Sequence, residues 1–206
     1  MKNYLLLALL VVGCRRASDL PIDTSGSVIP TADSGRAVAT PTDSAGAHSC
    51  GVTTTPVLEE DGIGNLKEGL SVADVARSCE VISDSEQQGQ EGTMERVLVV
   101  RIANEIVRAI IVNDRVFRIE VNTPRFRTSD SLGVDTPLRR IAAQRGAQFA
   151  PGEDGVYGFS PEHCGLSFRF SVPSRPPSGS QWTAALINEA HGDAAVNRVI
   201  VIPCRR

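Results

Sequence analysis

The sequence has few aromatic residues, almost no lysine and no long apolar run. Aromatic residues make up 4% of the 206 residues, whereas hydrophobic residues as a whole make up 41%. This apolar fraction excludes a collagen-like or wholly disordered chain. No apolar run reaches the ~18 residues that a transmembrane helix needs. The net charge of −3 lacks the strong basic excess of nucleic-acid binders, so we expect no nucleic-acid partner.

Motifs that carry familiar chemistry are also missing. The sequence contains no Gly-x-Ser-x-Gly element and no Cys-x-x-Cys pair, and its histidines have no metal-ligand spacing with the cysteines. We therefore expect no metal site and no cofactor, and a non-enzymatic role is favoured. The alternative is a small envelope hydrolase that uses His163, because the neighbouring Glu162 could orient its imidazole.

The N-terminus has the layout of an export signal. Lys2 precedes an unbroken apolar run over residues 4–12, which is too short to span a bilayer but suits a signal peptide. The run ends in Val11-Val12-Gly13-Cys14, which resembles the lipobox of bacterial lipoproteins. That resemblance implies removal of residues 1–13 and attachment of lipid, palmitate included, to Cys14. The alternative is an ordinary secretory signal.

Lipidation would anchor the protein in the cell envelope, facing the periplasm or the cell surface, with the membrane itself as a partner. Residues 14–56 then form a disordered tether, because they are rich in Ser, Thr, Ala, Gly, Pro and Asp and contain no aromatic residue. The remaining residues, 57–206, are enough for one hydrophobic core.

Four further cysteines form an even set, which suits disulfide bonds in an exported protein: Cys50, Cys79, Cys164 and Cys204. The last two flank expected strands at 165–172 and 198–202. If those strands pair antiparallel, the start of one lies beside the end of the other, within disulfide distance. The sequence therefore predicts that the last two cysteines pair, and by elimination that the first two pair.

Helix and strand patterns alternate along residues 57–206. Ser71 and Asp74 predict the start of a short helix that ends near Cys79. A second helix starts at 135–137, where Asp, Thr and Pro suit a first turn, and a third covers 180–190. The polar residues 83–94 read as a loop. Besides the two strands already named, alternating apolar residues predict strands at 96–103, 106–112, 116–121 and 156–160.

We therefore expect an α+β fold of two helix-plus-antiparallel-meander units packed as one domain, with units at 57–128 and 129–206. The residues Gly62-Ile63-Gly64 and the helix start at 69–75 carry a resemblance to β-lactamase-inhibitor-like proteins. They also resemble the small outer-membrane assembly lipoproteins of the SmpA/OmlA type. These resemblances imply a fold built from repeated helix-plus-sheet units and bear less on function.

Charge is unevenly distributed along the domain. Residues 57–95 carry a net charge of −8, and residues 96–145 carry +5. One interpretation is that both surfaces are simply solvated and neutralise each other. The other is a sheet face on which Arg101, Arg108 and Arg118 bind an anionic partner, since Arg suits carboxylate and phosphate recognition.

Within the expected strand 116–121, a period of two places Phe117, Ile119 and Val121 on one face and Val116, Arg118 and Glu120 on the other. The function that fits all of these features is a membrane-anchored envelope lipoprotein acting as a protein-interaction or structural module. Besides the membrane, the expected partner is an envelope protein, which no motif identifies.

Lipidation gives the first testable prediction. Metabolic labelling with a fatty-acid analogue is expected to mark the wild-type protein, because the lipobox-like segment directs acylation of Cys14. The Cys14→Ala variant is the control and should carry no label. Equal labelling of the two proteins would show that the anchor is absent or lies elsewhere.

Overall fold

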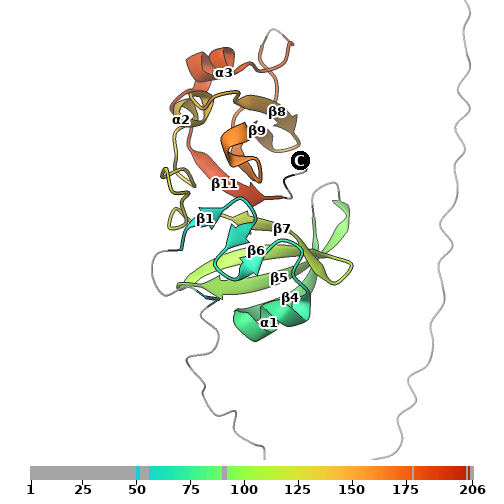
Figure 1. Cartoon of the computed structure of the whole chain (residues 1–206). Coiled ribbons are helices and arrows are strands. Elements are labelled where there is room, and N and C mark those ends of the chain that lie inside the picture. Colours follow the sequence, from blue (N-terminus) through green and yellow to red (C-terminus); the bar gives the residue numbers. More distant parts are fainter. Residues whose placement is uncertain (1–49, 52–55, 90–91, 178, 203, 205–206) are drawn as a thin grey trace, which may run out of the picture. The chain divides into compact units, whose positions relative to one another are not determined.

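The computed structural model describes residues 50–51, 56–89, 92–177, 179–202 and 204, and all of them belong to one compact unit of the chain, Asp43–Arg206 (Figure 1). The expected signal peptide, the lipidation site Cys14 and nearly all of the expected tether lie outside the described residues. Within the described residues, no helix is both long and apolar enough to cross a membrane.

An antiparallel sheet of eight strands dominates the described part of the chain. Its spatial order is β4-β5-β6-β7-β11-β10-β9-β8, so chain neighbours β4 to β7 form one half and β8 to β11 the other. The first half contains β4 (Glu80–Gln88), β5 (Met94–Ile102), β6 (Glu105–Val112) and β7 (Arg115–Val121). The second half contains β8 (Gln148–Gly152), β9 (Gly155–Phe159), β10 (Leu166–Phe170) and β11 (Val196–Val201). The two halves meet where β7 pairs with β11, with Glu120 opposite Ile200.

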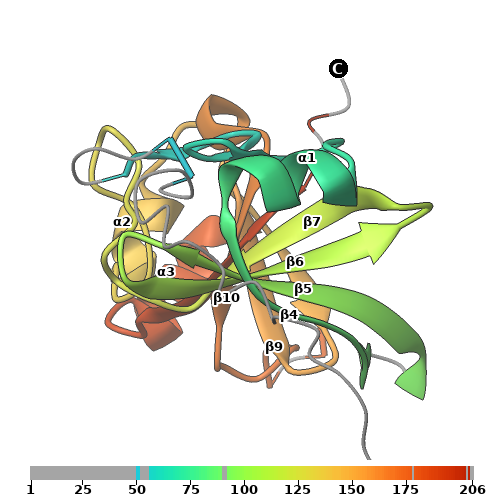
Figure 2. The same ribbon diagram turned by 90° about the horizontal axis from the view of Figure 1, so that it is seen from below.

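In the described part of the chain, three short α-helices and a small sheet lie beside the main sheet. The helices are α1 (Val72–Ser78), α2 (Leu138–Ala142) and α3 (Ala184–His191), and the small sheet contains β1 (Leu58–Glu59), β2 (Gly62–Ile63) and β3 (Leu66–Lys67). In Figure 2 the helix α1 lies on one side of the strands β5, β6 and β7. Mixed helices and antiparallel sheets make this an α+β fold.

One hydrophobic core joins these elements on a single side of the main sheet. Val75 of α1, Ile141 of α2 and Ile187 of α3 belong to the same buried cluster as the large side chains of the sheet. These include Leu98, Ile119, Phe168 and Phe170. Burial of this apolar area is the main favourable term in folding. The small sheet packs close to β10, because a Cβ on Gly165 would come within 1.8 Å of the carbonyl oxygen of Glu60.

Local sequence explains the first helix and the tight turns. The Ser71 hydroxyl caps α1 by accepting a hydrogen bond from the Asp74 backbone N–H at 3.1 Å. Two-residue turns join β5 to β6 at Ala103-Asn104 and β6 to β7 at Asn113-Asp114, with positive φ at all four residues. Such turns match the twist of the flanking strands.

Both cysteine pairs are disulfide-bonded in the structure: Cys50–Cys79 and Cys164–Cys204. The second bond sits where β10 and β11 pair antiparallel, with Leu166 opposite Val201. The first bond ties Cys50, which is fully buried, to the residue that ends α1. The fold thus includes Cys50, near the end of the segment that the sequence suggests is a tether.

Several sequence-based expectations are wrong at the level of single elements. Most of the expected loop 83–94 belongs to strands, chiefly β4, whose polar side chains suit an edge strand with largely exposed residues. A bulge between Ile110 and Ile111 shifts the register of β7, so Val116 is buried and Phe117 is 42% exposed. The start of α2 also differs, because the Thr136 hydroxyl bonds the Gly133 backbone rather than capping the helix.

The disulfides give the second testable prediction. Replacing both Cys164 and Cys204 by Ser should lower the free energy of unfolding by about 2–4 kcal/mol, because the bond restricts the unfolded chain over a loop of 40 residues. Denaturant titration of the oxidised proteins measures this difference. A variant as stable as the wild type would mean that this bond does not hold the two strand ends together.

Candidate functional site

The candidate site is the face of the main sheet that points away from the helices, hereafter the open face. Cross-strand register places its side chains together: Glu95, Val97 and Arg101 on β5, Arg108 and Ile110 on β6, Arg118 and Glu120 on β7, Arg198 and Ile200 on β11, Ser167 and Arg169 on β10, and Tyr157 and Phe159 on β9. Val97, Ile110 and Ile200 are buried although they lie outside the main core. Arg stems can cover such apolar side chains while their charged ends stay in water.

A nearly buried carboxylate lies at the centre of this face. The side chain of Glu120 is 5% exposed. Its oxygens accept hydrogen bonds from Arg108 Nη1 and from Arg118 Nε, each at 3.2 Å. Arg198 Nη1 lies 3.8 Å from the same carboxylate. Glu120 thus connects the strands β6, β7 and β11.

The surrounding guanidinium groups have further partners. Arg118 Nη2 donates to both oxygens of Glu95, at 2.9 and 3.1 Å, and Arg108 Nη2 donates to Gln87 Oε1 at 3.1 Å. Arg198 Nε donates to Asn122 Oδ1 at 3.1 Å. Because each of these three guanidinium groups bonds a group from another strand or from the segment that follows one, the network holds the Arg side chains in defined positions.

The structure brings together two of the three arginines that the sequence indicates as an anion-binding face. Arg108 and Arg118 share Glu120, whereas Arg101 pairs with Glu80 at 3.1 Å at the more exposed end of the sheet. All three are ion-paired within the chain, so an anionic partner would compete with internal carboxylates. Sequence reasoning missed Glu120 as the organising group, although a carboxylate between Ile119 and Val121 in a central strand is a signal for a paired buried charge.

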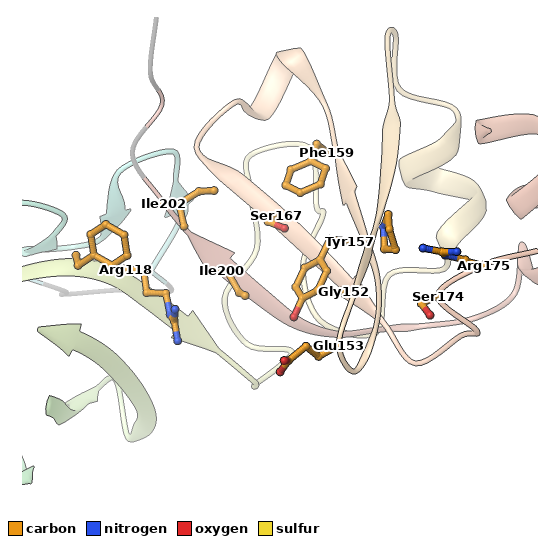
Figure 3. Close-up of a pocket in the computed structure, with 12 residues that line it drawn as sticks. Arg118, Gly152, Glu153, Tyr157, Phe159, Ser167, Ser174, Arg175, Ile200 and Ile202 are labelled. Atoms are coloured by element: carbon orange, nitrogen blue, oxygen red, sulfur yellow. The ribbon is translucent and has the colours of Figure 1, made fainter. Parts of the chain in front are cut away.

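A groove of about 610 Å³ opens on this face next to the seam between the two halves. In Figure 3, Ser167, Ile200 and Ile202 lie between Arg118 on one side and Tyr157 and Phe159 on the other. Phe117, exposed by the bulge in β7, also lines the groove. Further lining residues are Pro151, Gly152, Glu153, Ser174 and Arg175. The volume falls in the range of sites that bind ligands or partner side chains.

His163, on which the hydrolase alternative rests, lies in the short 3-10 helix η2 (Pro161–His163). Its Nε2 is 3.1 Å from Asp130 Oδ2, so its acidic partner is Asp130 rather than the adjacent Glu162. Partial burial would raise the pKa of Asp130, but hydrogen bonds from Thr128 and His163 outweigh that effect and hold this pKa below its usual value.

The hydroxyl nearest to His163 in sequence has a structural role. Ser160 is buried and its hydroxyl accepts the Glu162 backbone N–H at 3.2 Å, at the start of the 3-10 helix. A nucleophile needs its own hydroxyl bonded to the base, and the one hydrogen bond of the Ser160 hydroxyl among the described residues is to the Glu162 backbone. The pair of His163 with Asp130 therefore fits a link between two surface segments.

One group of potential metal ligands also occurs in the described residues. Glu60 lies beside the second disulfide, and the ligand atoms of Glu60, Cys164 and Cys204 are within 4.8 Å of one another. Both sulfur atoms are bonded to each other, so neither is available as the thiolate that metals bind.

Comparisons with known proteins bear on the fold. No family model matches the chain, and the curated proteins contain no significant match. Among solved structures, the chain is similar to the uncharacterized protein yfeY from Escherichia coli, with a TM-score of 0.51 and 17% sequence identity. The likeness covers 73% of this chain and 100% of that one. At this identity it shows a shared fold alone.

The network around Glu120 gives the third testable prediction. Glu120→Gln should lower the free energy of unfolding by about 2–4 kcal/mol, because it leaves Arg108, Arg118 and Arg198 without their shared counter-charge in a largely buried setting. Glu80→Gln is the matched control, since the Glu80–Arg101 pair is exposed. It should cost less than about 1 kcal/mol. Equal losses in denaturant titrations would contradict the central role of Glu120.

Proposed function

We propose that this protein is a lipid-anchored component of the bacterial cell envelope whose folded domain binds another envelope protein through the open face. The observation that carries the proposal is that this sheet face presents an ordered set of Arg side chains and an aromatic groove, neither of which the described helices cover. Interfaces between proteins are enriched in Arg and aromatic residues at their centres.

The export part of the proposal rests on the sequence and on the cysteines. A lipobox-like segment ends at Cys14, and all four cysteines of the described domain are in disulfides. Disulfides persist in oxidising compartments such as the periplasm and the cell surface. The anchor would keep the domain close to its membrane. The length of chain between the anchor and Cys50 would set how far from the membrane the domain can bind its partner.

The architecture supports a division of the domain into two helix-plus-meander units, at 57–128 and 129–206. The sheet contains two sets of four strands, and each set follows a helix in the chain, α1 before β4 and α2 before β8. The insertion of α3 between β10 and β11 distinguishes the second set. In this arrangement the groove of the open face forms where the two sets of strands join. The resemblance to proteins with repeated helix-plus-sheet units also favours such a division.

Site-specific photo-crosslinking gives the fourth testable prediction. A photoreactive amino acid at position 117 should yield a cross-linked product of discrete mass in intact cells, because Phe117 lines the groove. The matched control is position 186 on α3, since Phe117 and Leu186 have nearly equal exposure, 42% and 44%.

The proposal requires that position 186 yields little product. Cross-linking of similar strength from both positions would indicate unspecific contacts. Products from position 186 alone would place the partner on α3 and would contradict a role of the open face.

A further inference from the structure

Ser167 is the most unusual polar residue of the groove. It is 3% exposed and lines the groove from β10, directly between Ile200 on one neighbouring strand and Phe159 on the other. Among the described residues, its hydroxyl makes no hydrogen bond, and its oxygen does not belong to the fully buried side-chain atoms that lack a partner. The hydroxyl therefore reaches the groove, where it can bond a group that enters.

A second donor reaches the same groove. Arg118 uses its Nε for Glu120 and its Nη2 for Glu95, while its Nη1 has no acceptor within the described part of the chain. Because a guanidinium only donates, the Nη1 hydrogens of Arg118 can bond water or an acceptor that enters the groove. The network that holds Arg118 in place also prevents it from turning freely toward another site.

Aromatic and aliphatic side chains form another part of the groove, beside the polar residues Glu153, Ser174 and Arg175. Phe117, Tyr157 and Phe159 contribute aromatic rings and Ile200 contributes an aliphatic floor. In Figure 3 the rings of Tyr157 and Phe159 stand beside Ser167. Aromatic pairs with offset or edge-to-face geometry add favourable energy beyond the buried area, so the groove suits an aromatic ring more than a flexible aliphatic chain.

We propose that this groove binds a tyrosine side chain of the partner protein, an inference that rests on the proposed function of the open face. The ring packs among the aromatic residues, and its phenol oxygen accepts hydrogen bonds from Ser167 Oγ and Arg118 Nη1. Phenylalanine supplies no acceptor, and the tryptophan N–H is a donor that would face the Arg118 donors. Tyrosine therefore supplies both a ring for the aromatic part of the groove and an acceptor for Ser167 and Arg118.

The test uses two synthetic peptides, N-acetyl-Gly-Ser-Tyr-Ser-Gly-amide and its counterpart with phenylalanine, titrated into the isotope-labelled protein. Methyl resonances of Ile200 and Ile202 report binding in NMR spectra. The tyrosine peptide should bind at least about fivefold more tightly, as expected for a hydrogen bond of about 1 kcal/mol. Ser167→Ala should lower the affinity for the tyrosine peptide by about fivefold, the share of one hydrogen bond, and leave the affinity for the phenylalanine peptide unchanged.

Ser85→Ala is the matched control, because Ser85 is an exposed serine on β4, at the opposite edge of the sheet. It should leave both affinities unchanged. Equal affinities of the two peptides for the wild type, or no binding at millimolar concentrations, would overturn the assignment of tyrosine. Cross-linking from position 117 would then still support the open face as an interface, whereas tyrosine binding without any cross-link would count against the proposed function alone.

Discussion

The hydrogen bonds of Glu120 hold together the centre of the open face, where the strands β6, β7 and β11 lie side by side. This carboxylate lies on β7, the strand that pairs with β6 on one side and with β11 on the other. It accepts from Arg108 and Arg118 and lies near Arg198, so it crosses the seam between the two halves of the sheet. A charge that is nearly buried needs such partners, and the same partners are thereby held in place for recognition.

This organisation separates the two sides of the sheet by chemistry. The helix side contains the continuous hydrophobic core that stabilises the fold. The open face instead carries ordered charged side chains, and these lie over the buried apolar residues Val97, Ile110 and Ile200. A surface of this kind can bind a partner at little cost in side-chain entropy, because its Arg residues are already fixed. This ordered Arg surface is the reason for favouring a binding role over catalysis at His163. The His163 ring pairs with Asp130 on another part of the surface.

Much of the framework could be predicted from the sequence, because it depends on local patterns. Alternating Val and Ile residues mark β5 and β6, and Ser71 marks the start of α1. The strand β4 was not predictable in this way, since an edge strand needs no apolar face. The strand β8 was missed as well, because its Pro151 and Gly152 read as turn residues.

The site was harder to predict than the framework. A bulge in β7 decides that Phe117 is exposed at the groove and that Val116 is buried, and no local pattern signals that extra residue. Ile187 rather than Leu186 is the buried residue of α3, because the position of that helix over the core sets its inward face. Groove residues such as Ser167 on β10 and Phe117 on β7 come from separate strands, and both strands must pair with β11 to bring them together.

Isoleucine-methyl NMR tests most directly whether the open face binds the partner. Cross-linking from position 117 first identifies the partner, and spectra of the domain are then recorded with and without that purified protein. Ile106, Ile110 and Ile200 lie on the open face, and Ile63, Ile141 and Ile187 lie in the core on the other side. The account predicts shifted or broadened signals for the first set and unchanged signals for the second. Changes confined to Ile141 and Ile187 would place the partner on the helices and contradict a role for the open face.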